Sequence, residues 1–298
     1  MASTPAREAL RDLLASRQIV LAPGVFDGIS AQLVRRTGHR AAYLTGGGVA
    51  ASGFGLPDIG LVTASEMAER VRMIVGVLGD IPLIADADTG YGAPINVVRT
   101  VRAYESAGAA AIQLEDQAFP KRCGHLPDKE LIAATAFEQK LAAAVDCRTD
   151  ENYLVIARTD ARAALGLDEA IERGNRYARA GADIIFVEAP QGTDEIERIA
   201  REVDAPLLIN LVPGGLTPIE SAARLQELGY AIAIHPGMPL ARAIAAMLEA
   251  LCDFNGRTGA EFLPETRRNS STWSGWPSGL ESRRSIRPRR DSHGHDDD

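Results

Sequence analysis

Short apolar runs alternate with longer amphipathic segments along most of this chain. Each run is rich in aliphatic residues and ends in a small or polar residue, as expected for strands that are buried on both faces of a parallel sheet. The predicted strands are 19–22, 41–45, 82–86, 110–115, 153–159, 183–188, 206–211 and 230–235. The predicted helices are 28–37, 65–78, 96–107, 137–144, 168–180, 194–202, 218–228 and 240–251.

Eight strand–helix repeats between residues 19 and 252 fit a closed (β/α)8 TIM-type barrel better than an open, doubly wound sheet. The alternative is a sheet of six or seven strands in which one loop has been misread. Residues 1–18 mix charged and apolar side chains and predict an additional N-terminal helix. We therefore expect residues 1–252 to form one α/β barrel domain that carries the catalytic site.

The last part of the chain has a different composition. Residues 253–298 are rich in Ser, Arg, Gly and Pro and contain few apolar side chains apart from Trp273 and Trp276. Such a segment cannot bury enough apolar surface to form a core of its own. It predicts an irregular C-terminal extension that is flexible or loosely docked.

Charge and cysteine content narrow the class of protein. The 298 residues carry a formal net charge of −8, so there is no global basic field that would bind nucleic acid or an anionic membrane. Cys123, Cys147 and Cys252 are widely spaced and odd in number, which argues for a reducing compartment. The N-terminus lacks a signal-peptide core, and no apolar run approaches the ~20 residues needed to span a bilayer. These features predict a cytoplasmic protein.

A loop after the fourth predicted strand carries the most distinctive chemistry. Lys121, Arg122 and His125 surround Cys123 and Gly124 in five consecutive residues. Neighbouring positive charge lowers the pKa of a thiol, which can then transfer a proton near neutral pH. The alternative is an exposed basic loop whose cysteine has no chemical role.

Acidic residues follow neighbouring strands at the end of the barrel where active sites lie. Asp86 and Asp88 alternate on one face of the third strand, and hard oxygen ligands suit Mg2+, with Mn2+ as a second choice. A structural pair that accepts backbone hydrogen bonds is the alternative. Glu115 and Glu188 end two further strands, where each can hold metal-bound water or pair with an arginine.

Other strand ends carry groups that recognise anions. Arg158 can bind a carboxylate through two hydrogen bonds, although pairing with Glu188 is an equally ordinary role. The glycine run that begins at Gly46 exposes backbone N–H groups or forms only a turn. Asn210 and Thr217 flank the seventh strand end, where they can hold a second anionic group. Together these features fit a small di- or tricarboxylate substrate and a divalent metal.

At this point a family resemblance becomes clear. The segment 121–125, Lys-Arg-Cys-Gly-His, resembles the isocitrate lyase signature. Five further segments match in the same order at predicted strand ends: 45–47, 55–58, 86–92, 114–117 and 157–160. The chain resembles the isocitrate lyase/phosphoenolpyruvate mutase superfamily over roughly residues 15–250. Within it, the short chain resembles the branch of 2-methylisocitrate lyases and carboxyphosphonoenolpyruvate phosphonomutases.

The resemblance implies a Mg2+-dependent reaction through an enolpyruvate-like species, with Cys123 as proton donor to the departing acid. Position by position, the implied catalytic residues are Cys123, Lys121, Arg122, Gly124, His125, Tyr43 and Glu115. The implied substrate-binding residues are Thr45, Gly46, Gly47, Asp58, Arg158, Glu188, Asn210 and Thr217. Asp86 and Asp88 are the implied metal ligands. The resemblance also implies a homo-oligomer, a tetramer in which C-terminal helices are exchanged.

Two segments depart from the pattern of 2-methylisocitrate lyases. Pro213 stands in the segment after Asn210 where these lyases usually have Glu, and His235 begins a sequence that differs from their Tyr-Pro-Leu pattern. The chemical identity of the distal half of the substrate is therefore left open.

The leading hypothesis is a carbon–carbon lyase that acts on a 2-methylisocitrate-like 2-hydroxy acid, releasing pyruvate or glyoxylate and a dicarboxylate. The alternatives are phosphonomutase chemistry, hydrolysis of oxaloacetate or a related oxo acid, and a non-catalytic barrel that binds a small acid.

Overall fold

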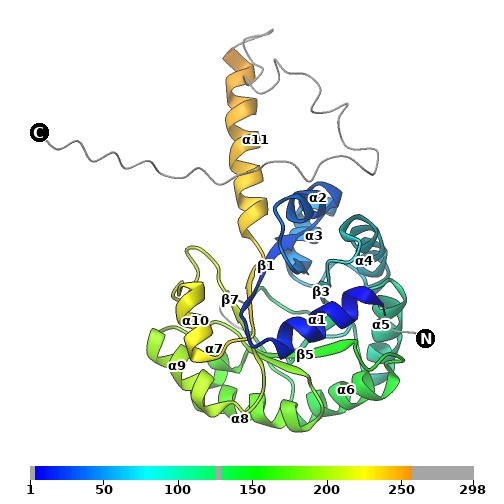
Figure 1. The fold of residues 1–298 in the computed structure, drawn as a ribbon, viewed down its shortest axis with the longest axis vertical. Coiled ribbons are helices and arrows are strands. Elements are labelled where there is room, and N and C mark those ends of the chain that lie inside the picture. The colour runs from blue at the N-terminus through cyan, green and yellow to red at the C-terminus, as the bar shows by residue number, and fades with distance from the viewer. Residues whose placement is uncertain (1–3, 125–128, 257–298) are drawn as a thin grey trace, which may run out of the picture. The chain divides into compact units, whose positions relative to one another are not determined.

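The strands close into a parallel barrel. The computed structural model describes residues 4–124 and 129–256. Within these ranges each strand pairs with the next in sequence, and the eighth pairs with the first (Figure 1). The strands are β1 (Val20–Val25), β2 (Ala42–Leu44), β3 (Leu83–Asp86), β4 (Ala111–Glu115), β5 (Leu154–Thr159), β6 (Ile184–Val187), β7 (Leu207–Asn210) and β8 (Ile232–His235). The predicted (β/α)8 barrel is confirmed, and the alternative with six or seven strands is wrong.

Helices follow every strand, and those of the barrel form its outer ring (Figure 1). The predicted ones correspond to α2 (Gly28–Arg36), α4 (Ala64–Leu78), α5 (Pro94–Ser106), α6 (Ala134–Cys147), α8 (Leu167–Arg179), α9 (Thr193–Glu202), α10 (Ala222–Leu228) and α11 (Met238–Gly256). The chain divides into two compact units, Met1–Arg242 and Ala243–Asp298, and α11 starts in the first and continues through the beginning of the second. Helical structure thus extends beyond residue 252. The rest of the predicted extension, 257–298, lies outside the described residues.

Three short helical segments were not predicted, and all follow strand ends on the side of the candidate site. They are α3 (Gly46–Val49), the π-helical turn η1 (Ala50–Phe54) and α7 (Ala161–Leu165). Glycine has a low helix propensity, so the run at the start of α3 indicates a loop when it is considered alone. In the structure, the Thr45 hydroxyl caps α3 by accepting a hydrogen bond from the Gly48 N–H at 3.2 Å.

The barrel strands are buried on both faces, which explains their continuous apolar sequences. One set of side chains fills the barrel interior, and Ile84 of β3 shows the arrangement. It pairs in register with Tyr43 of β2 and with Ala111 of β4, and all three contribute to the interior cluster. The alternate residues pack outward against the helices in a larger second cluster. This packing places most polar side chains of the described strands near the strand ends.

Helix α1 (Pro5–Ala15) closes the end of the barrel opposite the candidate site (Figure 1). Its Leu10 and Leu13 side chains join the interior cluster. Arg7 is 3% exposed, pairs with Asp150 at 2.9 Å and donates to the Ala109 carbonyl at 3.0 Å. The predicted N-terminal helix is therefore present and works as a plug. No helix within the described ranges is long and apolar enough to cross a membrane.

Replacing Arg7 by Met should lower the free energy of unfolding by about 3–5 kcal/mol, because buried Asp150 would lose its cation. Urea denaturation of the purified protein measures this change. Arg11→Met is the matched control. Arg11 lies on the same helix but is 38% exposed and pairs with Asp183 at 3.3 Å, so its loss should cost at most about 1 kcal/mol. Equal effects of the two substitutions would contradict the proposed role of Arg7 in the plug.

Candidate active site

Polar side chains from six consecutive strands meet at the carboxyl end of the barrel. Each is at most 8% exposed, although most have a charge or a strong hydrogen-bonding group. They lie at or just after the ends of β2 to β7: Tyr43, Asp86, Asp88, Glu115, Arg158, Glu188, Asn210 and Thr217. The structure thus brings these predicted site residues to the same end of the barrel, where it is energetically costly to leave them unpaired.

A hydrogen-bonded chain links Tyr43 to Asp86 through a residue that the sequence analysis missed. Gln113 of β4 is fully buried, accepts from the Tyr43 hydroxyl at 2.9 Å and donates to Asp86 Oδ1 at 3.2 Å. Burial, followed by the charge of Asp86, raises the pKa of Tyr43 well above its ordinary value, so this phenol stays neutral. Because the Tyr43 hydroxyl donates its hydrogen bond to Gln113, the Tyr43 oxygen can accept a hydrogen bond from a ligand. The available signal was an amide two positions before Glu115, on the same strand face.

Asp86 is held by hydrogen bonds, while Asp88 keeps an oxygen without one. Asp86 accepts from the backbone N–H groups of Gly46 at 3.2 Å and Asp88 at 3.1 Å. Asp88 has φ = 47°, a left-handed conformation that is costly for a residue with a Cβ and is frequent at functional sites. Its Oδ1 lies 2.9 Å from the Lys121 ammonium but outside hydrogen-bond geometry. Burial raises the pKa of Asp88 to about 6, and the charge of Lys121 limits that rise.

This carboxylate pair suits a cation that retains most of its water. In the described part of the chain, no group of three or more His, Cys, Asp or Glu side chains is arranged to hold a metal. Mg2+ usually binds through one or two carboxylates, with water and substrate oxygens completing its shell. The unbonded, buried oxygens Asp88 Oδ1 and Glu115 Oε1 fit such a shell. Asp86 and Asp88, supported by Glu115, are therefore the residues that could hold Mg2+ or Mn2+.

Arg158 lies among three carboxylates. Its guanidinium donates two hydrogen bonds of 3.0 Å to Asp160 and lies 3.3 Å from Glu115 and 3.7 Å from Glu188. The ring of Phe186 supports it from one face, with its centroid 5.3 Å from the guanidinium carbon. Pairing with acidic residues and binding a ligand carboxylate are compatible roles for Arg158, because the ion pairs fix the plane of the guanidinium that would bind the ligand. Burial raises the pKa of Glu115 well above its ordinary value, although Arg158 opposes this.

Glu188 and Asn210 form a second polar group on β6 and β7. The Asn210 amide lies 3.3 and 3.4 Å from the two Glu188 oxygens. Within the described chain, buried Asn210 Oδ1 and Thr217 Oγ1 have no hydrogen-bond partner. Buried polar atoms of this kind are rare and mark places where a ligand or water completes the bonding. Asp116, which lies in the matched segment 114–117, instead accepts from Thr159, Arg173 and Tyr177 and joins strands to α8.

Hydrogen bonds made by Gln117 hold the start of the segment that carries Cys123 in place. Gln117 forms an antiparallel bridge with Leu131, and its side-chain amide bonds both the N–H and the carbonyl of Arg122 at 2.9 Å. Lys121 pairs with Asp58 and Asp88, whereas the Arg122 side chain is exposed. Cys123 is half-buried. His125, predicted as part of the same loop, lies outside the described residues.

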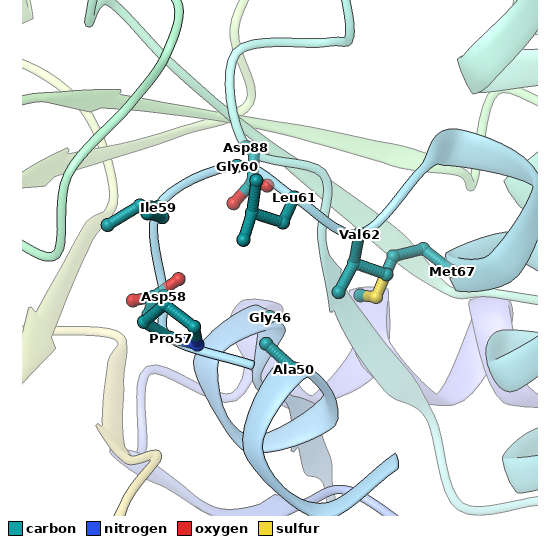
Figure 2. A pocket seen from close by; sticks show the side chains of 10 residues that line it. All are labelled: Gly46, Ala50, Pro57, Asp58, Ile59, Gly60, Leu61, Val62, Met67 and Asp88. Atoms are coloured by element: carbon teal, nitrogen blue, oxygen red, sulfur yellow. The ribbon is translucent and has the colours of Figure 1, made fainter. Parts of the chain in front are cut away.

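A small cavity lies beside the carboxylates, and two further predicted residues, Gly46 and Asp58, line it. Figure 2 shows Asp58 and Asp88 lining it together with Gly46 and a largely apolar wall. Its volume is about 10 Å3, room for about one water molecule. A Cβ on Gly47 would come within 2.9 Å of Asp58 Oδ2, so glycine permits this close approach. The Gly46 and Gly48 N–H groups bond to Asp86 and Thr45, which leaves fewer N–H groups for an anion than the glycine run predicts.

Comparison with known proteins places the chain among related enzymes. The sequence profile of the phosphoenolpyruvate phosphomutase family matches residues 10–254. A 2,3-dimethylmalate lyase of Eubacterium barkeri is 43% identical over 88% of this chain and 97% of its own length. A 2-methylisocitrate lyase of Aeropyrum pernix is 48% identical over 76% of this chain and 72% of its own. A chloroplastic carboxyvinyl-carboxyphosphonate phosphorylmutase of Arabidopsis thaliana is 41% identical over 80% and 71%.

Solved structures show the same likeness. Oxaloacetate acetylhydrolase, in complex with the inhibitor 3,3-difluorooxalacetate, superposes with a TM-score of 0.83 at 32% identity, covering 92% of this chain and 98% of its own. Phosphonopyruvate hydrolase in complex with oxalate and Mg2+ gives a TM-score of 0.75 at 30% identity, with coverages of 90% and 97%. Relatives with lyase, mutase and hydrolase activities therefore share this architecture.

The raised pKa of Asp88 predicts how the affinity of the carboxylate pair for Mn2+ depends on pH. Protons and the cation compete for the same carboxylate, so the dissociation constant should increase about tenfold per pH unit below about 6 and stay level above it. Calorimetric titration of the metal-free protein between pH 5 and 8 measures this. Asp88→Asn should weaken binding, whereas Asp80→Asn, at the opposite end of β3, should leave it unchanged. An affinity that stays constant from pH 5 to 7 would contradict the assignment of Asp88.

Proposed function

Because the chain belongs to the phosphoenolpyruvate mutase/isocitrate lyase superfamily, we propose that it is a divalent-metal-dependent carbon–carbon lyase. Its substrate is a 2-hydroxy di- or tricarboxylate of the 2-methylisocitrate or 2,3-dimethylmalate type. The products are a 2-oxo acid, pyruvate or glyoxylate, and a second carboxylate. One observation carries this proposal: the Cys123 segment lies directly against Arg158 and Glu188, since a Cβ on Gly124 would approach Glu188 Oε1 to 2.6 Å. This contact brings the residue that follows Cys123 against the group proposed to bind a carboxylate.

Each site residue has a role in this reaction. Arg158 binds the carboxylate next to the carbinol carbon, and its three carboxylate partners keep it in place. The Tyr43 hydroxyl donates its hydrogen bond to Gln113, so its oxygen accepts a hydrogen bond from the substrate hydroxyl before cleavage. The Thr45 cap holds Gly46 and Gly47 beside Asp86 and Asp58. When bound to Asp86 and Asp88, a divalent cation supplies Lewis-acid stabilisation of the developing negative charge.

Cys123 completes the cleavage. The bond between the carbinol carbon and its neighbour breaks as the hydroxyl proton passes to the Glu115 carboxylate, whose Oε1 has no hydrogen-bond partner among the described residues, and the 2-oxo group forms. The electron pair stays on the departing carbon, which takes a proton from the Cys123 thiol. A cleaving enzyme needs such an acid, and a positioned proton donor contributes about 10²–10⁴-fold to the rate. Lys121 and Gly124 place the thiol, with Arg122 and His125 assigned to the same loop by the resemblance.

The far end of the substrate is assigned to Glu188, Asn210 and Thr217. The unbonded Asn210 oxygen and Thr217 hydroxyl can accept or donate hydrogen bonds to a distal group. Pro213 replaces an expected acid in the adjoining loop, which favours a distal half different from that of 2-methylisocitrate. Because one methylene group changes discrimination by only about 1–3 kcal/mol, small changes in this loop can redirect specificity.

Two other activities receive specific support. Hydrolysis of oxaloacetate is favoured by the likeness to oxaloacetate acetylhydrolase. Phosphonomutase chemistry is favoured by the family match and the plant phosphorylmutase. Phosphonomutase chemistry releases no carbon leaving group that needs a proton, so dependence on Cys123 separates it from the lyase. Hydrolysis of oxaloacetate also releases a carbon centre that takes a proton, so its products, oxalate and acetate, are what separate it from the lyase.

We also propose a homo-oligomer, a tetramer by resemblance, in a cytoplasmic location. Helix α11 carries large apolar side chains that are exposed in the single chain: Met247, Leu248, Leu251 and Phe254. Light scattering at micromolar concentration should give an even multiple of 31.8 kDa. A monomeric mass would contradict the assembly but not the activity.

The decisive experiment is an NMR assay of the purified protein with Mg2+ and five compounds. The panel contains 2-methylisocitrate, isocitrate, 2,3-dimethylmalate, oxaloacetate and phosphonopyruvate. A 2-oxo acid released together with the matching mono- or dicarboxylate supports the lyase and names its substrate. Oxalate and acetate from oxaloacetate would move the assignment to hydrolysis, and a changed phosphorus spectrum would move it to phosphonate chemistry. Activity that survives chelation would exclude the metal.

Replacing Cys123 by Ser should lower kcat for carbon–carbon cleavage by about 10²–10⁴-fold, because a hydroxyl is a far weaker acid than a thiol. Steady-state kinetics with the substrate found above measure the change. Cys252→Ser, an exposed cysteine of α11, is the matched control and should retain full activity. Unchanged cleavage by the Cys123 variant would remove this residue as the acid.

A further inference from the structure

Lysine is unusually rare in this chain, and all of it lies near the candidate site. Only three of the 32 basic residues are lysines: Lys121, Lys129 and Lys140. Lys121 pairs with Asp58 and Asp88, and Lys140 donates to the Thr89 carbonyl at 2.9 Å. Surface ion pairs elsewhere in the described chain use arginine. The three lysine side chains, each a compact ammonium with three donors, therefore all lie around the site.

Lys129 is almost completely buried and joins two parts of the site. Its side chain is 1% exposed, and its ammonium lies 2.9 Å from Asp160 Oδ1. The same ammonium donates a hydrogen bond to the carbonyl of Gly124, the residue after Cys123. Asp160 in turn accepts both hydrogen bonds from the Arg158 guanidinium. A single side chain thus connects the Cys123 segment to the partner of the carboxylate-binding arginine.

The backbone at Gly124 has little freedom beside these groups. Gly124 is buried, and a Cβ added to it would collide with the Arg158 guanidinium as well as with Glu188. Its carbonyl is directed to Lys129. Contact on one side and a charged donor on the other therefore fix the position of this peptide. Cys123 precedes this residue directly in the chain, so the position of Gly124 restricts where the Cys123 backbone can lie.

We propose that Lys129 is a positioning residue, which fixes the Gly124 peptide to Asp160 and so places the Cys123 thiol relative to the carboxylate bound by Arg158. This inference rests on the proposed lyase function. A misplacement of about 1 Å in a reacting group costs on the order of 10²-fold in rate. The effect of Lys129 should therefore appear in kcat and depend on the presence of the thiol.

The fold should tolerate the loss of Lys129. Burial acts to raise the pKa of Asp160, but the charges of Arg158 and Lys129 outweigh it and lower that pKa. After Lys129→Met, Asp160 keeps its two bonds to Arg158, so its charge stays compensated. Methionine also fills most of the volume of the lysine stem. A structural role alone would therefore reduce stability without a selective effect on the chemical step.

A double-mutant cycle tests the proposal. Lys129→Met should lower kcat about 10²-fold in the wild-type protein but less than about threefold in a Cys123→Ser background, where no thiol remains to be placed. Lys129→Gln, which keeps a donor for the Gly124 carbonyl, should recover part of the loss. Losses of equal size in the two backgrounds would overturn the proposal.

Arg148→Met is the matched control. Arg148 likewise bonds a backbone carbonyl, that of Tyr153 at 2.9 Å, and an aspartate, Asp183 at 2.6 Å, but before the start of β5 at the opposite end of the barrel. It should lower the melting temperature without changing kcat. If it reduces kcat as strongly as Lys129→Met does, the effect of Lys129 is merely structural.

A second readout does not depend on turnover. In protein with Cys147 and Cys252 replaced by Ser, iodoacetamide should alkylate Cys123 several-fold faster after Lys129→Met or Lys129→Gln, because the Gly124 peptide is released. An unchanged alkylation rate would contradict the proposal that Lys129 fixes the Gly124 peptide. If wild-type protein turns over none of the panel compounds but the alkylation rate still changes, the proposed function is contradicted, whereas the role of Lys129 in fixing the Gly124 peptide is supported.

Discussion

The guanidinium of Arg158 lies among the carboxylates of Asp160, Glu115 and Glu188, and the rest of the site is arranged around this charge. A buried guanidinium is stable only when its donors are satisfied, and these three acids come from three neighbouring strands or the residues just after them. Their positions follow from the closed barrel, which brings successive strand ends together. The result is a guanidinium held by its neighbours in a site where carboxylates predominate.

Acidic side chains outnumber basic ones at this end of the barrel. Asp58, Asp86, Asp88, Asp160, Glu115 and Glu188 face only Lys121, Lys129 and Arg158 among the described residues. Burial is the main cause of the raised pKa values of Asp88 and Glu115, and neighbouring carboxylates add to it. The excess of carboxylates explains why a divalent cation and an anionic substrate suit the same site, since the cation offsets the carboxylates of both.

Backbone proximity is the second constraint. Gly47 lies against Asp58 and Gly124 lies against Arg158 and Glu188, at distances that no Cβ would permit. These two glycines allow main-chain segments to approach charged side chains closely, so the wall of the candidate site includes peptide groups as well as side chains. The Cys123 segment reaches the site in this way, and its base is fixed by Gln117.

The sequence by itself determined the barrel and the positions of its strand ends, because apolar runs and amphipathic helices report local burial directly. It also determined the superfamily, since six short motifs keep their order and spacing. Only the tertiary structure decided which polar residues are partners: Gln113 links Tyr43 to Asp86, Lys129 links Gly124 to Asp160, and Asp116 belongs to a structural network. These pairings join residues that are distant along the chain or separated by a loop. Neither charge nor periodicity reveals them, because the energy of a buried polar group depends on what surrounds it after folding.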